Sequence, residues 1–256
     1  MRGFRLALLA LLLFVGIPGY GLAGSVTLQI MGDTGGNFTY DETLLGCGLG
    51  GDPLLCSSSN VDPNALTDPN GPYITPFWEM TSWDVSFDQD PFVSSAFAFK
   101  NVGATQNFTI NTSTASVPLA STLMGGSMGG SVTDSSNDGA GGLSTVTPAA
   151  LYLALIDGAV VGPAAQLHPD PYSVSFLFNG DTQNITAVNF GLPGPTVPGP
   201  AVTTSIGIRN RFSLSAGDSV AMTNFFVVVP EPGSAALLGL GLVGVALLRR
   251  RPAHRR

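Results

Sequence analysis

The chain has 256 residues, with 10 Lys and Arg against 17 Asp and Glu, and a formal net charge of −7. A net negative charge of this size should repel a phosphate backbone, which disfavours a nucleic-acid-binding protein. With only two cysteines and two histidines, the chain has few ligands for zinc and few candidates for a histidine-based catalytic centre.

The first residues have the three parts of a secretory signal peptide. Arg2 and Arg5 form a positive n-region, Leu6–Ile17 is an apolar h-region, and Gly21-Leu22-Ala23 supplies small residues at the positions that signal peptidase reads. The apolar stretch is too short to cross a bilayer comfortably, which disfavours an uncleaved anchor. We therefore expect a signal peptide over residues 1–23, removed after Ala23, and export by the general export machinery.

Residues 24–229 form the expected exported part, with three basic and sixteen acidic side chains and a net charge of −13. Apolar and polar residues alternate with a period of two in several segments, as is typical of antiparallel strands with one solvated face. The segments are Trp83–Phe87, Phe97–Phe99, Phe108–Ile110 and Tyr172–Phe178, with further candidate strands at Val26–Ile30, Leu151–Ile156, Ile185–Phe190, Val202–Ile208 and Val220–Val229. Because turn residues separate many short strands, we predict one mainly β domain, an antiparallel β-sandwich of jelly-roll or immunoglobulin-like type.

Three segments interrupt the strand pattern. Asp52–Pro76 is rich in Pro, Asn and Asp, and we expect an irregular loop there. Ser121–Thr147 is a Gly/Ser-rich segment of low complexity, and we expect residues 121–147 to be flexible. Leu192–Pro200 reads as a connector of Pro and Gly.

Cys47 and Cys56 lie close together in the sequence, at the two ends of a Gly-rich stretch. In an oxidising compartment an isolated pair of this kind is most simply a disulfide. A redox pair would be closer in sequence, and a zinc site would need two more ligands, which no nearby histidine supplies.

Residues 227–256 combine three features in a fixed order. Pro230, Glu231 and Pro232 predict an extended, non-helical segment, because each proline fixes φ and lacks an N–H. Ser234–Leu248 holds fifteen uncharged residues, which as a helix would span roughly 22 Å, short of the ~30 Å hydrocarbon core. Arg249, Arg250 and Arg251 follow, with two more arginines, and should stop translocation and face the cytosol. An ordinary membrane anchor preceded by a turn is the alternative.

This order of tripeptide, short apolar helix and arginine run resembles a PEP-CTERM sorting signal. The resemblance implies export across the inner membrane of a Gram-negative bacterium, transient anchoring by a transmembrane helix over 234–248, and cleavage near Pro230-Glu231-Pro232 by exosortase, a membrane-embedded cysteine enzyme. It also implies an association with exopolysaccharide production. The expected protein is therefore an inner-membrane-anchored precursor with a sorting signal over 230–256, and then a structural or adhesive protein of the cell surface or extracellular matrix.

A few acidic residues are candidates for metal binding. Asp84, Asp88 and Asp90 would share one face of a strand, where their oxygens suit calcium, although they do not form an EF-hand loop. A solvated acidic edge is the simpler alternative.

We recognise no catalytic constellation in the sequence, so we expect a protein that is not an enzyme and has no catalytic residues. A carbohydrate-binding module is one alternative, with Trp78, Trp83 or Tyr73 stacking on sugar rings, although Trp83 also suits a core position. A secreted hydrolase is another, and it would need His168 or a pair of carboxylates such as Glu79 and Asp84.

Overall fold

The computed structural model describes residues 26–34, 37–48, 54–69, 71–88, 91–231 and 233. The expected signal peptide over 1–23, the membrane helix over 234–248, and Arg249, Arg250 and Arg251 therefore lie outside the described residues. Within the described part of the chain, no helix is both long enough and apolar enough to cross a bilayer.

Strands dominate the described residues, and the helices are single short turns. The strands are β1 (Val26–Gly32), β2 (Asn37–Tyr40), β3 (Leu54–Ser57), β4 (Trp78–Asp88), β5 (Phe92–Asn101), β6 (Gln106–Ala115), β7 (Thr122–Thr133), β8 (Gly142–Thr145), β9 (Tyr152–Ile156), β10 (Ala159–Val160), β11 (Gln166–Leu167), β12 (Ser173–Ser175), β13 (Thr182–Phe190), β14 (Val197–Gly199), β15 (Ser205–Leu214) and β16 (Ser219–Pro230). The helices are η1 (Ser58–Asn60), α1 (Pro63–Thr67) and η2 (Pro163–Ala165). The prediction of a mainly β domain is confirmed.

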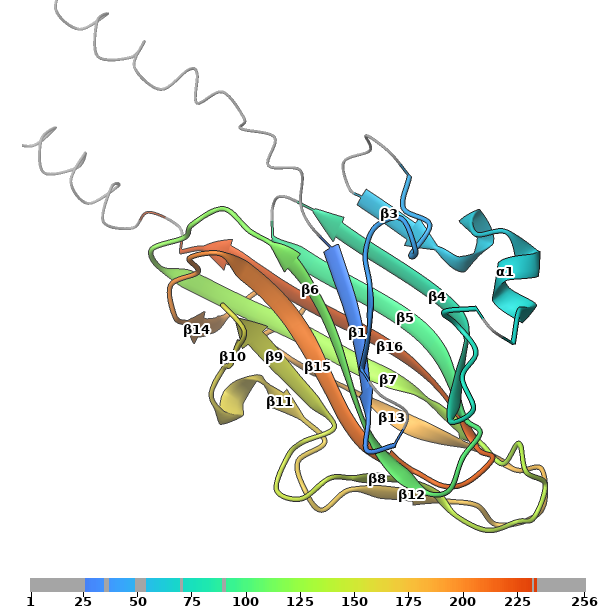
Figure 1. The fold of residues 1–256 in the computed structure, drawn as a ribbon. Coiled ribbons are helices and arrows are strands. Elements are labelled where there is room, and N and C mark those ends of the chain that lie inside the picture. Colours follow the sequence, from blue (N-terminus) through green and yellow to red (C-terminus); the bar gives the residue numbers. More distant parts are fainter. Residues whose placement is uncertain are drawn as a thin grey trace, which may run out of the picture.

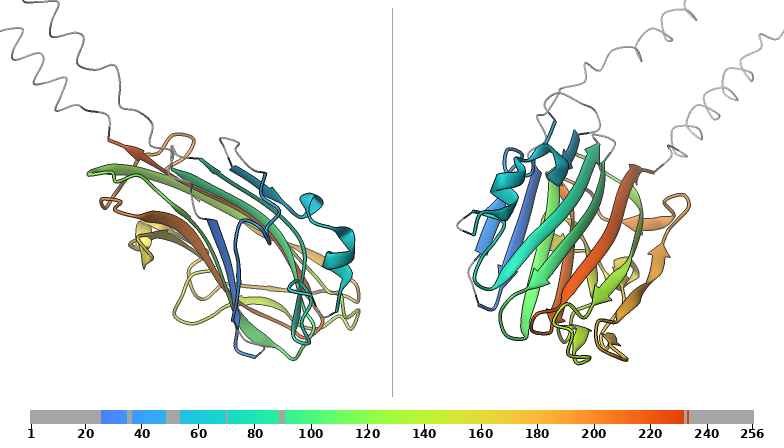
Figure 2. Two further views of the ribbon diagram at one scale, coloured as in Figure 1. Left: turned by 45° about the horizontal axis from the view of Figure 1, so that its top comes forward. Right: turned by 90° about the vertical axis from the view of Figure 1, so that its right-hand side faces the viewer.

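Two antiparallel sheets lie face to face (Figures 1 and 2). Sheet A has the order β10-β9-β15-β6-β1-β2, with β8, β11 and β12 paired beside it, and sheet B has the order β13-β7-β16-β5-β4-β3, with β14 beside β7. The chain alternates between the sheets from β5 onward, since β5, β7, β13 and β16 belong to sheet B, whereas β6, β9 and β15 belong to sheet A. The last two strands are inner strands: β15 lies between β6 and β9, and β16 lies between β5 and β7.

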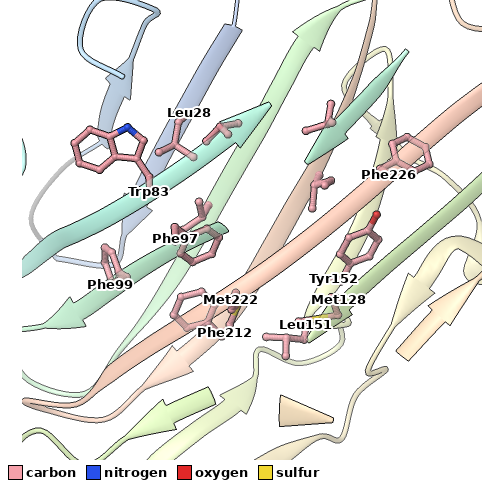
Figure 3. Packing of buried hydrophobic residues seen from close by; sticks show 14 of the residues in the cluster. Leu28, Trp83, Phe97, Phe99, Met128, Leu151, Tyr152, Phe212, Met222 and Phe226 are labelled. Carbon is pink, nitrogen blue, oxygen red and sulfur yellow. The ribbon is translucent and has the colours of Figure 1, made fainter. Parts of the chain in front are cut away.

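The core lies between the two sheets and is lined by the inward side chains of both (Figure 3). Phe99 of sheet B packs against Phe108 of sheet A, with ring centroids 4.6 Å apart, and both side chains are buried. Two buried amides also connect the sheets, since Asn210 Nδ2 of β15 donates to Asn224 Oδ1 of β16 over 2.9 Å. Burying apolar area on both inner faces is the dominant stabilising contribution in such a sandwich.

The segment 121–147, which its composition predicts to be flexible, contains two strands, β7 and β8. Residues 122–133 form β7, which pairs with both β13 and β16 inside sheet B. Its glycines are required by close packing: a Cβ on Gly130 would lie 2.1 Å from the carbonyl oxygen of Ala221, and a Cβ on Gly126 would lie 2.6 Å from the ring of Phe190. Glycine-rich segments are often flexible, but in β7 the missing side chains allow a neighbouring backbone and an aromatic ring to approach the strand closely.

The structure differs from the predicted elements in other segments as well. Of the predicted strand Tyr172–Phe178, only β12 forms, because the chain turns after it, with the N–H of Leu177 donating to Asp181 Oδ2, and Phe178 is left 62% exposed. The predicted loop Asp52–Pro76 contains β3, η1 and α1, and β14 forms within the predicted connector Leu192–Pro200.

Candidate functional site at the end of strand β16

The sorting residues predicted from the sequence lie at the end of an inner strand. β16 pairs with β5 as far as Val227 and with β7 along its whole length, so that Pro230 lies opposite Thr122. The N–H of Glu231 donates to the carbonyl oxygen of Ser121 over 3.1 Å. The sheet therefore continues into the Pro-Glu-Pro tripeptide without a linker.

A proline fits at position 230 because that position faces the β5 side of β16, where the described pairing with β5 ends at Val227. Successive residues of a strand direct their N–H groups to opposite sides. The N–H of Val228 donates to Pro91, on the β5 side of the strand, and the N–H of Glu231 donates to the β7 side. By this alternation position 230 faces the β5 side, and β5 itself begins at Phe92. Pro230 and Glu231 are exposed, which leaves the Glu231 carboxylate accessible to a partner. Pro232 lies outside the described residues.

The described chain begins and ends at the same end of the sandwich. β1 starts with Val26 opposite Thr114, near the end of β6, and β16 finishes opposite the start of β7. Figure 2 shows the start of β1 and the end of β16 at this side of the domain. The first and last described strand residues, Val26 and Pro230, therefore lie at one end of the domain.

A family model for the PEP-CTERM protein-sorting motif matches residues 228–251. The chain carries a PEP-CTERM motif. The resemblance noted in the sequence is thereby confirmed, and such a motif indicates an exported protein that is sorted by exosortase from a membrane-anchored precursor. No curated protein and no solved structure matches the chain.

The PEP-CTERM match begins inside the folded domain. Residues 228–230 belong both to the match and to β16, and Val228 is a fully buried core residue. The sorting motif and the domain therefore share three residues, and the packing of β16 fixes the position of Pro230, the first residue of the tripeptide.

The sulfurs of Cys47 and Cys56 form a disulfide bond. The bond ties the segment after β2 to β3, the edge strand of sheet B. Trp83 holds the same segment from the core side, because its Nε1 donates to the carbonyl oxygen of Leu45 over 2.9 Å. The segment after β2 is thus held against the edge of sheet B by a covalent bond and by hydrogen bonds, among them those from Trp83 and from the N–H of Gly48 to the carbonyl oxygen of Leu55.

The calcium candidates are only partly described. Asp84 is exposed and Asp88 is half-buried, and both lie on the outer face of β4 as expected from the period of two. The two residues are four positions apart in the strand, which separates their Cα atoms by about 13 Å, too far for the two carboxylates to bind one ion together. Asp90 lies outside the described residues, and within the described ones no group of three His, Cys, Asp or Glu side chains could hold a metal. Calcium binding stays a prediction.

The proposed sugar-stacking residues are core residues, which corrects that interpretation. Trp78, Trp83 and Tyr73 are 0%, 1% and 2% exposed. Trp83 stacks on Tyr73 with ring centroids 4.8 Å apart, and Trp78 stacks on Phe99 at 5.5 Å. None of the three presents a ring face to solvent, since the inward positions of β4 direct both tryptophans into the core.

The residues considered for a hydrolase lie in unrelated places. His168 is 8% exposed, its Nε2 lies 2.8 Å from the carbonyl oxygen of Thr186, and its ring packs on Tyr172. Glu79 and Asp84 lie on the outer face of sheet B. These contacts give His168 a role in joining the turn before β12 to β13.

A group of carboxylates that sequence reasoning missed lies at the other end of the sandwich. Asp134 Oδ2 accepts the N–H groups of Gly139 and Gly180, at 2.8 and 2.9 Å. Burial opposes ionisation, but these bonds outweigh it and lower the pKa of Asp134 to about 2. Asp218 is fully buried beside it, and burial, with Asp134 and Asp138 adding to it, raises the pKa of Asp218 to about 6. Asp134 thereby joins the turns after β7 and β12.

Sequence reasoning also passed over the two arginines of β15. Arg209 and Arg211 both point outward from sheet A. Their spacing of two within a strand was the available signal, because it places both side chains on one face.

Proposed function

We propose that the protein is a structural or adhesive component of the cell envelope or extracellular matrix, which exosortase processes and which associates with exopolysaccharide. The observation that carries the proposal is the continuity between β16 and the PEP-CTERM motif, because it presents Glu231 at the surface of a folded, strongly acidic domain. An acidic surface favours solubility after release from the membrane.

We further propose that the sandwich is a jelly roll. Its support is the strand order β13-β7-β16-β5 in one sheet and β9-β15-β6 in the other, in which the last two strands are inserted between earlier ones and successive long strands alternate between the sheets. Two interlocked Greek keys give this interleaved order. The fold by itself does not assign a function.

Expression in a host with and without exosortase tests the sorting. With the enzyme, the mature protein should lack residues 234–256 and leave the membrane fraction; without it, the intact chain should stay in the membrane. Intact mass and membrane fractionation measure both. Identical products in the two hosts would contradict the proposal.

A matched pair of variants separates recognition of the motif from loss of a surface charge. Glu231→Gln should reduce processing, because the carboxylate is the exposed charge of the tripeptide. Glu79→Gln, on the outer face of β4, should leave processing unchanged. Equal processing of both variants would show that Glu231 is not recognised.

A further inference from the structure

The outer face of sheet A carries two neighbouring arginines. Along β15 the side chains of Arg209 and Arg211 alternate with the buried Asn210 and Phe212, so both guanidinium groups leave the same face of the sheet. Their Cα atoms are about 7 Å apart, the distance between alternate residues of a strand. Both side chains are half-buried.

Amide side chains from two other strands extend this row. In the register of sheet A, Arg209 lies opposite Asn111 of β6, and Asn111 lies opposite Gln29 of β1. Arg209 Nε donates to Asn111 Oδ1 over 2.8 Å, and Asn111 Nδ2 donates to Gln29 Oε1 over 3.2 Å. These bonds orient the guanidinium of Arg209, whose terminal amino groups form no hydrogen bond to a described residue. Thr109 lies opposite Arg211 in the next row.

We call these residues, Gln29, Thr109, Asn111, Arg209 and Arg211, the arginine face. Within the described part of the chain neither arginine forms an ion pair, whereas the third basic side chain, Lys100, lies opposite Glu79 in sheet B. Burial, followed by the charge of Arg211, lowers the pKa of Arg209, although a guanidinium stays protonated in proteins. Two adjacent like charges without a counter-ion are unfavourable, so an anion bound there would be stabilised.

We propose that the arginine face binds a carboxylated polysaccharide, with the two guanidinium groups donating to carboxylates on the glycan and the amides and hydroxyl donating to its sugar hydroxyls. The planar guanidinium matches a carboxylate with two parallel hydrogen bonds. The choice of a glycan as the bearer of the carboxylates rests on the proposed matrix function. The site itself rests on the unpaired arginines and the hydrogen-bonded row beside them.

The net charge of the exported domain does not prevent this binding. At physiological salt the screening length is about 8 Å, so the acidic end around Asp134 and Asp218 is screened from a group in contact with Arg209. A narrow glycan chain can lie along one row of side chains. Duplex DNA presents about one charge per 1.7 Å over a broad surface, which would bring many phosphates near the surrounding carboxylates.

Affinity electrophoresis of the full chain in neutral detergent tests the proposal. The gels contain polygalacturonate, dextran sulfate, uncharged dextran or duplex DNA. We expect retardation by polygalacturonate that weakens as salt is raised, none by dextran, and weaker retardation by dextran sulfate and DNA. The double variant R209Q/R211Q should raise the apparent Kd by at least about tenfold, since a charge-assisted hydrogen bond contributes more than a neutral one.

Matched variants distinguish binding at the arginine face from a general effect of the net charge. Lys100→Gln removes the same charge from the opposite sheet and should bind as the wild type does. R209K/R211K keeps both positive charges but lacks the planar guanidinium groups, and it should bind better than R209Q/R211Q. If the double variant melts early, Arg211→Gln alone keeps the test valid, because that side chain has no hydrogen bond to a described residue, and it should show a partial loss.

Retardation of R209Q/R211Q equal to that of the wild type would overturn the proposal. An equal loss in Lys100→Gln, or binding of DNA or dextran sulfate as tight as that of polygalacturonate, would also overturn it. Processing of R209Q/R211Q by exosortase should be normal. Lost binding and lost processing can therefore be scored separately, so that failure of this inference is distinct from failure of the proposed sorting.

Discussion

Phe226 and Phe225 are adjacent in β16 but point to opposite faces of sheet B, and they allow a quantitative test of the fold. Phe226 is 0% exposed and lies in the core, with its ring centroid 6.4 Å from that of Phe190. Phe225 is half-buried on the outer face, against Phe92 at 5.9 Å. Phe226→Ala should therefore create a core cavity, whereas Phe225→Ala should remove one surface aromatic pair.

The expected magnitudes differ severalfold. A buried Phe→Ala substitution costs about 3–5 kcal/mol of unfolding free energy, whereas a surface aromatic pair contributes about 0.5–1.5 kcal/mol. At roughly 2–4 °C per kcal/mol for a domain of this size, Phe226→Ala should lower Tm by about 6–20 °C and Phe225→Ala by a few degrees. Thermal unfolding followed by circular dichroism in detergent measures both. Equal shifts would refute the reasoning, because a register slip of one residue exchanges the two faces of a strand.

Other predictions address the polar core, the acidic end and the glycine strand. Asn210→Leu or Asn224→Leu alone should cost about 1–3 kcal/mol in urea unfolding, because one amide stays buried without its partner, and the double variant should cost less than either. Between about pH 4 and 6 the Asp218 carboxyl is protonated in the folded protein but ionised in the unfolded chain, where its pKa is 3.8. The stability of the wild type should therefore fall as pH rises through this range, and thermal melts of Asp218→Asn should lack this decrease. Gly130→Ala should cost about 1–3 kcal/mol by steric overlap, whereas Gly162→Ala, with open space around it, should be nearly neutral; matching urea midpoints for the two would contradict the packing of β7.

The strands that could be predicted from the sequence are those with large apolar residues on one face. In β4 and β6 the alternation of Trp83, Val85 and Phe87, or of Phe108 and Ile110, reflects burial of one face against the opposite sheet. β7 could not be predicted in this way. Its glycines provide no apolar side chain to alternate, and its strand conformation depends on β16 and β13, which lie far along the chain.

The candidate sites also differ in how directly the sequence identifies them. Pro230 and Glu231 could be identified directly, because a sorting motif is a continuous stretch of sequence read by another protein. The arginine face could not, because Asn111 lies 98 residues before Arg209, and Gln29 lies 82 residues before Asn111. Only the pairing of β1, β6 and β15 brings them into one row. Long-range register is the part of a β-sandwich that a single sequence specifies least directly.

The inner position of β16 determines how the sorting motif can be presented. An enzyme that binds the tripeptide as an extended segment has to compete with Ser121 for the N–H of Glu231. That bond contributes about 0.5–1.5 kcal/mol net, whereas even a micromolar complex is stabilised by about 8 kcal/mol. Exosortase can therefore engage Glu231 while β16 stays paired as far as Val228, whose N–H is held by Pro91 and whose side chain is buried in the core. Processing is accordingly compatible with a domain that is already folded, and unfolding of β16 is not required for access to Glu231.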